Sequence, residues 1–248
     1  NWRQYTLTNE SIIRSLAIGD NQKIYVGGQD DIGYFKADMH GKLVFHSLKP
    51  KLPEDKQDFT PINSTVFLEG KVFFNTGKYQ FIWDTKKQVF SILESESAFL
   101  RLFVIGNTLY QVERGKGLAR FIDGRFILLS GGELLANGGL VTMAPLKNEE
   151  GKIFLVTASL GMFIYDGKQF TPIRSEVDDF LKESRIYSGT VLNDGNILLG
   201  TLSGGAVIIN SRGELLKSYN QANGLRDNSI YNSFQDRSGG IWLATNNG

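Results

Sequence analysis

Residues 196–210, NILLGTLSGGAVIIN, repeat with small changes the stretch at 152–166, KIFLVTASLGMFIYD. Residues 239–248, GGIWLATNNG, match the first two-thirds of both. In each copy an apolar run ends at a threonine, and successive threonines are 44 residues apart: Thr157, Thr201 and Thr245. A fixed period of this length indicates a repeat architecture, which decides the fold before any single motif is considered.

Three further copies are less regular. Residues 71–84, KVFFNTGKYQFIWD, place Thr76 in the same position, which we call the threonine column. Two looser copies at the start and in the middle of the chain have Gly28 and Val112 in this column. The repeat therefore runs through the whole sequence, with its best-formed copies in the second half.

Each repeat contains short runs rich in Val, Ile, Phe, Tyr and Leu that are separated by hairpin signals such as Asp166-Gly167 and Asp194-Gly195. Such runs predict antiparallel strands. Four strands in roughly 40–45 residues, repeated, are typical of a β-propeller blade, because stacked blades bury both faces of their sheets. Only residues 175–184, SEVDDFLKES, indicate a helical turn.

The sequence thus predicts an all-β protein, a β-propeller built from four-stranded antiparallel blades, with about five complete blades plus partial ones at the two chain ends. Residues 1–248 are expected to form a single propeller domain or a fragment of one. The N-terminal part is expected to include an outer strand at 2–6. The repeats are expected at about 11–55, 60–99, 100–138, 139–184 and 185–225, with a partial repeat at 226–248.

Strand counting predicts that the chain is a fragment of a longer polypeptide, because the third strand of the last repeat is missing. The alternative is a six-bladed ring that the N-terminal strand closes, which would leave an open sheet edge. The first ten residues do not have the pattern of a signal peptide. No apolar run approaches the roughly 20 residues that a membrane-spanning helix needs.

Composition excludes several classes of function. The chain has 27 Lys and Arg against 26 Asp and Glu, and no Cys. This balance argues against a sequence-independent nucleic-acid binder, which needs a basic surface. The lack of cysteine excludes thiol nucleophiles, iron–sulfur clusters and cysteine zinc sites. We expect no cofactor, no metal and no nucleic-acid partner.

The last 30 residues, 219–248, resemble the two-component regulator propeller repeat. The matching positions are Asn223, Gly224, Leu225, Asn228, Ile230, Asp236, Gly240, Trp242, Thr245 and Gly248. Other repeats keep the turn positions and the threonine column, but they replace the tryptophan by Tyr, Phe or Leu. The resemblance covers about 26 residues closely and the rest of the chain in weaker form.

The resemblance implies the sensor region of a bacterial hybrid histidine kinase. In that family the propeller lies outside the cytoplasm, ligands include oligosaccharides, and signalling proceeds through a dimer. We therefore expect a periplasmic or extracellular part of a membrane-anchored protein, with an oligosaccharide or another small polar ligand. A homodimer is expected in the parent receptor, and any kinase module lies outside these residues.

Catalytic patterns are weak in this sequence. No G-x-S-x-G, H-E-x-x-H or EF-hand pattern occurs. The two histidines, His40 and His46, are expected to be structural. The carboxylate pairs Glu94/Glu96 and Asp178/Asp179 could serve glycoside hydrolysis, but solvated charge explains them more simply. The sequence therefore predicts a non-enzymatic protein, with a protein-interaction scaffold as the alternative and a propeller lyase or hydrolase as the less favoured one.

Ligand contacts are expected where the loops between second and third strands meet the connections between blades, because these segments share one face of a propeller. Five side chains there supply an aromatic surface and hydrogen-bonding groups for a sugar or carboxylate: Gln29, Asp30, Tyr79, Arg114 and Lys116.

Two further predictions concern the repeat itself. The threonines of the column, Thr76, Thr157, Thr201 and Thr245, should be mostly buried, with locally hydrogen-bonded hydroxyls. Trp242 should be buried between the last blade and the blade of Leu198. The alternative for Trp242 is an exposed platform that stacks on a sugar ring.

Overall fold

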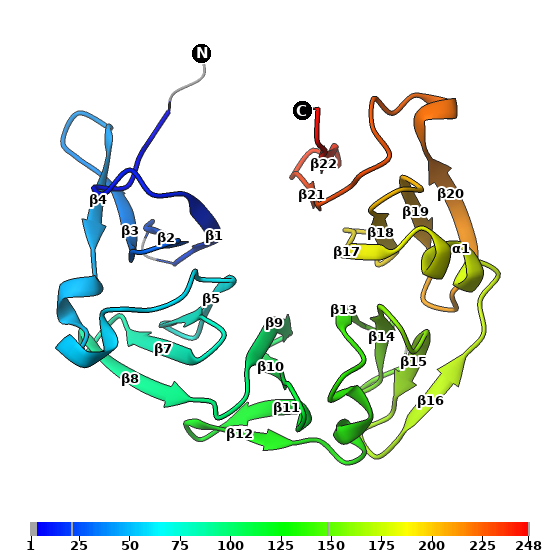
Figure 1. The fold of residues 1–248 in the computed structure, drawn as a ribbon, viewed down its shortest axis with the longest axis horizontal. Coiled ribbons are helices and arrows are strands. Elements are labelled where there is room, and N and C mark those ends of the chain that lie inside the picture. Colours follow the sequence, from blue (N-terminus) through cyan, green and yellow to red (C-terminus); the bar gives the residue numbers. More distant parts are fainter. Residues whose placement is uncertain (1–3, 21, 148, 248) are drawn as a thin grey trace. The chain divides into compact units, whose positions relative to one another are not determined.

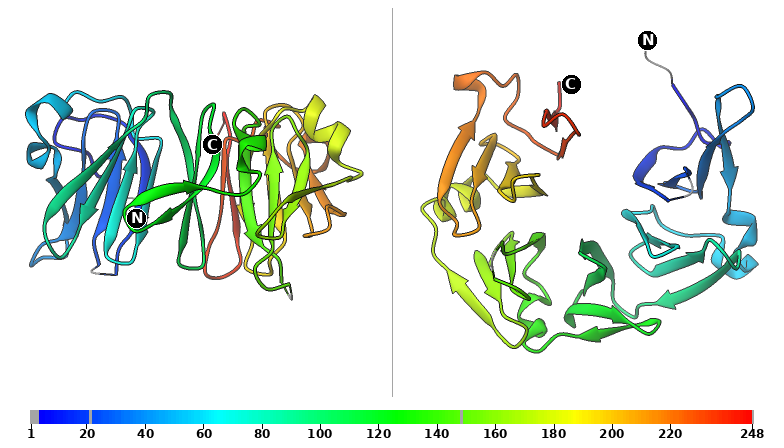
Figure 2. Two further views of the ribbon diagram at one scale, coloured as in Figure 1. Left: turned by 90° about the horizontal axis from the view of Figure 1, so that it is seen from below. Right: turned by 180° about the vertical axis from the view of Figure 1, so that it is seen from behind.

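The computed structural model describes residues 4–20, 22–147 and 149–247. The chain divides into two compact units, residues 1–128 and 129–248, which are described one at a time. Both are built from four-stranded antiparallel sheets whose strands lie side by side in chain order, so that the first and fourth strands form the edges (Figures 1 and 2).

The first unit holds three sheets. The first sheet contains β1 (Ile13–Ile18), β2 (Ile24–Gly28), β3 (Ile32–Ala37) and β4 (Leu43–Ser47). The second contains β5 (Ser64–Leu68), β6 (Lys71–Asn75), β7 (Tyr79–Asp84) and β8 (Val89–Glu94). The third contains β9 (Phe99–Ile105), β10 (Thr108–Glu113), β11 (Gly117–Ile122) and β12 (Arg125–Leu128). Two 3-10 turns lie between the first and second sheets, η1 (Lys49–Lys51) and η2 (Glu54–Lys56).

The second unit holds two complete sheets and one strand pair. The fourth sheet contains β13 (Leu140–Pro145), β14 (Ile153–Thr157), β15 (Met162–Tyr165) and β16 (Phe170–Ile173). The fifth contains β17 (Ile186–Val191), β18 (Ile197–Thr201), β19 (Ala206–Ile209) and β20 (Leu215–Tyr219). The pair is β21 (Asn232–Gln235) with β22 (Ile241–Ala244). The short helical elements of this unit are η3 (Gly132–Leu135), α1 (Asp178–Glu183) and η4 (Gln221–Asn223).

The predicted fold class is confirmed: the protein is all-β, with five four-stranded antiparallel propeller blades. Tight turns make this regular hairpin pattern possible. At Glu69-Gly70 and at Asp123-Gly124 both residues have positive φ, between 48° and 86°, as a two-residue hairpin turn that follows the strand twist requires. The predicted helical turn is also present, as α1.

Apolar clusters lie between neighbouring sheets within each unit. In the first unit, eleven buried residues fill the junction of the first and second sheets, among them Tyr25, Phe74 and Phe81. In the second unit, a cluster that includes Phe154 and Leu199 joins the fourth and fifth sheets. This arrangement follows from the alternation of side chains along each strand, which gives every central strand two buried faces.

The threonine column has the predicted environment. Thr76, Thr157 and Thr201 are at most 4% exposed, and Thr245 is half-buried. The hydroxyls of Thr157 and Thr201 donate to the carbonyls of Gly161 and Gly205, each at 2.8 Å, and accept from backbone N–H groups in the same loops. Each hydroxyl therefore holds the loop between a second and a third strand in shape.

The residue that occupies the threonine column in the third sheet was predicted wrongly. Glu113, not Val112, occupies the column in the third sheet, because Glu113 pairs with Phe99 at the start of β9. Thr157 pairs in the same way with Leu140 at the start of β13.

The residue three positions before the column faces the next sheet along the chain. Tyr25 stacks on Phe67 of the second sheet at 6.1 Å between ring centroids, and Phe73 meets Phe121 of the third sheet edge-to-face at 5.2 Å. In the second unit, Leu198 of the fifth sheet packs with Ile230, which precedes β21. In these three sheets the column therefore faces the following segment of the chain.

The prediction that Trp242 is buried against the blade of Leu198 is wrong, because Trp242 belongs to this forward-facing column. Its neighbour Leu243 packs toward the fifth sheet instead, and the tryptophan side chain is 61% exposed. The indole N–H donates to Asp236 Oδ2 at 2.8 Å. Hydrogen bonds from Ser238 and then from this indole lower the pKa of Asp236 to about 2.

The predicted outer strand at 2–6 is not supported. Residues 2 and 3 lie outside the described part of the chain, and residues 4–6 form no strand. Tyr5 and Leu7 instead pack against Val26 and Phe35, on the face of the first sheet that does not contact the second sheet. Of the two predicted partial repeats, the C-terminal one is present as β21 and β22; Gly248 lies outside the described residues.

Candidate functional site

In every complete sheet, the loop between the second and third strands lies beside a connection to a neighbouring sheet. In the first unit, the carbonyl of Lys78 accepts from the backbone N–H of Ser95, at 2.9 Å. The carbonyl of Ala98 accepts from the backbone N–H of Arg114, at 2.8 Å. The loops and connections that were predicted to form a binding face are therefore joined by main-chain hydrogen bonds.

Gln29 and Asp30 lie together on the loop between β2 and β3. The Asp30 carboxylate accepts from Lys49 Nζ at 2.8 Å, and Gln29 Oε1 accepts from Arg14 at 3.3 Å. Both side chains are exposed. They can exchange these partners for a ligand, since exposed ion pairs contribute little to stability.

Asp31, the next residue of this loop, is buried, at 6% exposed. Its Oδ1 accepts from the backbone N–H of Ile32 at 2.8 Å and from the Ser47 hydroxyl at 2.6 Å. Burial raises the pKa of Asp31, and these hydrogen bonds oppose the rise. This carboxylate holds the loop in place instead of facing a ligand.

Tyr79 is the centre of a charged cluster. Its ring is only 7% exposed, and the Nζ atoms of Lys56 and Lys78 lie 4.8 Å and 5.1 Å from its centroid. Glu94 accepts from Lys78 at 3.1 Å and from Lys56 at 3.3 Å. The hydrogen bond from Lys78 is the largest cause of the lowered pKa of Glu94. Lys56 also pairs with Asp55 at 3.5 Å, so the two lysines face two carboxylates, and the lysine side chains cover the ring.

Arg114 and Lys116 lie on the loop between β10 and β11. Lys116 pairs with Glu113 at 2.8 Å, which raises the pKa of Lys116. The Arg114 side chain is exposed; its main-chain carbonyl accepts from the Ser97 hydroxyl at 2.7 Å. Through the connection at 95–98, this loop adjoins the loop of Tyr79, whereas no hydrogen bond between described residues joins either loop to Gln29 or Asp30.

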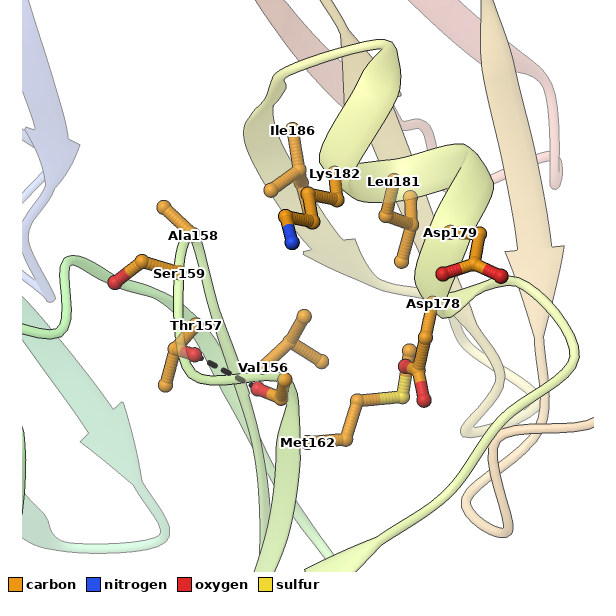
Figure 3. A pocket seen from close by; sticks show the side chains of 11 residues that line it. Val156, Thr157, Ala158, Ser159, Met162, Asp178, Asp179, Leu181, Lys182 and Ile186 are labelled. Atoms are coloured by element: carbon orange, nitrogen blue, oxygen red, sulfur yellow. Dashed lines mark hydrogen bonds between the residues drawn. The ribbon is translucent and has the colours of Figure 1, made fainter.

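The second unit contains a cavity of about 180 Å³ at the corresponding position, where the loop between β14 and β15 meets α1 (Figure 3). Its apolar part is formed by Val156, Met162, Leu181 and Ile186, and its polar part by Ser159, Asp178, Asp179 and Lys182. The helix is placed by two buried side chains, Val177 and Leu181, which join the core between the fourth and fifth sheets.

Asp178 has one carboxylate oxygen in use and one without a partner. Oδ2 accepts from the backbone N–H of Ser175 at 2.9 Å. Oδ1 is buried and has no hydrogen-bond partner among the described residues. Figure 3 shows this carboxylate beside Met162. The Lys182 amine lies on the other side of the cavity, toward Ala158 and Ser159. A carboxylate oxygen in this position requires a hydrogen-bond donor.

This cavity lies beside a loop of the kind that the sequence singles out, but the sequence does not predict the cavity itself. From the sequence, Asp178 and Asp179 are expected to be solvated charges, with a catalytic pair as the less favoured alternative, and no role is predicted for Lys182. Adjacent residues on a helix point apart, and Figure 3 shows the two carboxylates directed differently. The helical pattern at 175–184 is the signal that could have located the cavity. A helix in this connection leaves space between its side chains and the loop at 158–161.

Two structural features bear on enzymatic alternatives. Among residues 4–20, 22–147 and 149–247, no three His, Asp or Glu side chains are grouped so that they could hold a metal ion. His46 stacks on Tyr34 at 5.1 Å, in keeping with a structural role.

Within residues 4–20, 22–147 and 149–247, no helix has the length and apolar character needed to cross a lipid bilayer.

Comparison with known proteins identifies both the fold and one repeat. Solved structures of the extracellular domain of BT4673 from B. thetaiotaomicron, titled a one-component and a hybrid two-component system, are 18% identical to this chain. One of them gives a TM-score of 0.69 over 98% of this chain and 33% of that chain. The chain therefore spans about a third of the length of that domain.

Virginiamycin B lyase from Staphylococcus aureus is also similar, with 13% identity, a TM-score of 0.68, and coverage of 96% of this chain and 80% of that chain. At these identities both likenesses show the fold alone. No curated protein sequence matches the chain significantly.

The family model described as two component regulator propeller matches residues 224–247. This stretch begins just after η4 and contains β21 and β22. The resemblance that the sequence suggested is confirmed here: the chain carries a two-component regulator propeller repeat on a β-propeller fold.

Proposed function

We propose that this chain is a non-enzymatic, ligand-sensing propeller of a two-component signalling protein, in the part of that protein that lies outside the cytoplasm. The observation that carries the proposal is the cavity between α1 and the loop at 158–161, with its unpaired Asp178 oxygen. Further support comes from the matching repeat at 224–247 and from the extracellular domains that share the fold. The parent receptor is proposed to be membrane-anchored and dimeric.

The chemistry of the cavity favours a small hydroxylated ligand, such as one sugar ring of a carbohydrate. A hydroxyl can donate to Asp178 Oδ1, and another can accept from the Lys182 amine. The apolar side chains of Met162 and Ile186 can cover the C–H face of a ring. A cavity of about 180 Å³ accommodates one ring, not an extended chain.

The five side chains predicted from sequence remain a proposed second part of the binding face, in the first unit. Arg114 is the best placed of them, because its side chain is exposed at the tip of a loop. Gln29, Asp30 and Lys116 already have protein partners that a ligand would have to replace. Tyr79 would offer its ring only after Lys56 and Lys78 move away.

The proposal is tested by calorimetric titration of the protein with neutral monosaccharides and oligosaccharides. Asp178→Asn should weaken the binding of a responding sugar by about 10-fold or more, since hydrogen bonds to a charged group contribute about 1.5–3 kcal/mol. Glu183→Gln on the same helix is the matched control, because Glu183 does not line the cavity. Equal affinity of the Asp178 variant and the wild type would contradict the assignment of this cavity.

A scaffold that binds another protein is the second candidate. It is favoured by Leu16 and Ile18, which are 60% and 69% exposed on the same side of β1. A partner protein seated there would lose affinity on substitution of these two residues and would be unaffected by Asp178→Asn. A lyase or hydrolase activity has no comparable support, since the adjacent carboxylates of α1 point apart.

A further inference from the structure

A row of polar side chains crosses the second sheet at one level. Ser64, Asn75 and Gln80 are partners on β5, β6 and β7. Residues paired in this way project from the same face of the sheet. Asn75 and Gln80 are completely buried, so this row is interior although it is polar.

The row faces the third sheet. Gln111, on β10, donates from Nε2 to Asn75 Oδ1 at 3.0 Å, and Asn75 Nδ2 donates to the carbonyl of Leu100 on β9. Phe73, two residues before Asn75 on the same strand, contacts Phe121 of the third sheet. Ser64, Asn75, Gln80 and Gln111 therefore form a polar layer in the junction of these two sheets.

Four polar atoms of the polar layer are buried without a hydrogen-bond partner among the described residues: Ser64 Oγ, Gln80 Oε1, Gln80 Nε2 and Gln111 Oε1. Buried polar groups in native proteins are almost always paired, because desolvation without a hydrogen bond costs free energy. A fully buried glutamine with neither end of its amide paired is therefore a signal for a bound guest.

The mixture of donors and acceptors specifies the guest. The amide oxygens of Gln80 and Gln111 need donors, whereas Gln80 Nε2 needs an acceptor. A metal cation could satisfy only the oxygens, and an anion only the N–H. Water both donates and accepts, and a buried water typically makes about three hydrogen bonds.

We propose that the polar layer is a binding site for internal water, which is hydrogen-bonded to Gln80, Gln111 and Ser64 between the second and third sheets. Water bound there is an integral part of this junction. It links two sheets whose amide side chains are otherwise joined directly only through Asn75 and Gln111.

The direct test is a crystal structure of the whole chain at a resolution that shows ordered water. We expect a water oxygen within hydrogen-bond distance of Gln80 Nε2 and of Gln111 Oε1. A direct hydrogen bond between the two glutamines, a dry layer, or a cation with oxygen-only contacts would each overturn the proposal.

A thermodynamic test separates a hydrated layer from a dry one. Gln80→Met keeps the length of the side chain and removes both amide atoms. In a hydrated layer this variant loses hydrogen bonds, and the unfolding midpoint should fall by about 2–4 °C, as expected for a loss of about 1 kcal/mol in a protein of this size. In a dry layer it removes unpaired atoms, and a raised midpoint would refute the proposal.

Coupling supplies an independent readout. Gln80→Met and Gln111→Met should be non-additive, because a shared water connects the two amides. The control pair is Gln80→Met with Gln169→Met, since Gln169 is exposed and lies in the other unit. Strict additivity of the Gln80 and Gln111 changes would contradict a shared water.

Discussion

The two junctions of the first unit differ although they share the second sheet. The junction with the first sheet contains eleven buried apolar residues, whereas the junction with the third contains four, together with the polar layer. At the end of the second junction opposite that layer, Phe73, Leu109 and Phe121 line a cleft of about 300 Å³ near the turns Glu69-Gly70 and Asp123-Gly124. The first junction is mainly aromatic and aliphatic, with a hydrogen bond between Ser15 Oγ and Thr65 Oγ1 at 2.8 Å, whereas the second contains a whole polar layer.

The difference originates in the strands, which carry the polar layer, and in the connections. Residues 48–63 link the first and second sheets, and Leu48, Leu52, Phe59 and Ile62 from this segment enter the apolar cluster. The link between the second and third sheets is much shorter, 95–98, and carries Ser-Glu-Ser-Ala. The longer connection therefore adds apolar side chains to the first junction, whereas the short one adds none to the cluster of the second.

The largest expected effect compares neighbours on one strand. Phe74 faces the junction with the first sheet and Phe73 the partly polar junction with the third, and each is at most 1% exposed. Phe74→Ala should lower the free energy of unfolding by about 4–5 kcal/mol, and Phe73→Ala by about 3 kcal/mol, because the cleft beside Phe73 lets its surroundings relax. Denaturant unfolding of both variants measures the gap; a larger loss for Phe73→Ala would contradict the comparison.

A smaller effect is expected from the polar layer. Asn75→Ala leaves Gln111 Nε2 and the Leu100 carbonyl without the partner that Asn75 provides. We expect a loss of about 2–3 kcal/mol, since each abandoned buried group costs about 1–3 kcal/mol. Thermal and denaturant unfolding measure it. A loss no greater than that of the exposed control Asn193→Ala would show that the layer is not a specific polar contact.

Trp242 extends the comparison to a face with no following sheet in the structure. Trp242→Ala should cost less than about 1 kcal/mol, since the side chain is 61% exposed and surface changes are usually small. Leu198→Ala, at the same repeat position but completely buried, should cost about 2–5 kcal/mol. Similar losses in unfolding experiments would mean that Trp242 is buried in solution.

The smallest effect is a trend with pH at the loop edge of the first sheet. Burial raises the pKa of Asp31, so the folded protein holds a proton more tightly than the unfolded chain. Stability should therefore fall as the pH rises from the unfolded pKa through the folded one. Asp31→Asn lacks this loss, and its melting temperature relative to wild type should rise between pH 3 and 7. A difference that is constant with pH would contradict this assignment.

The repeat could be predicted from sequence because hairpins and alternating strands are local. Thr157 and Thr201 mark the same turn in every good copy, and five sheets follow from that pattern. Local sequence does not determine which neighbouring sheet the side chains of a repeat position face. Trp242 and Leu243 are both apolar, and only the packing of sheets shows that Leu243 looks back along the chain and Trp242 forward.

For the candidate site, too, the sequence predicts local features but not contacts between distant segments. Loop positions could be predicted, since they follow from strand order, and Gln29, Asp30 and Arg114 do lie at loop ends. The state of Tyr79 depends on Lys56, which comes from a distant connection. The cavity of the second unit depends on how α1 stands against the loop at 158–161, and no short-range pattern encodes such a contact.

The threonine hydroxyls have an evolutionary consequence. Thr157 and Thr201 bond main-chain atoms inside their loops, so the turn itself is held from the strand end, while Ser159 and Ser203 bond the neighbouring connections. The other side chains of these loops can vary more easily than Gly204, since a Cβ at Gly204 would lie 2.3 Å from Ser184 Oγ. The loop rims of the fourth and fifth blades are thus adjustable surfaces on a hydrogen-bonded frame, suited to randomised libraries that seek new recognition specificities.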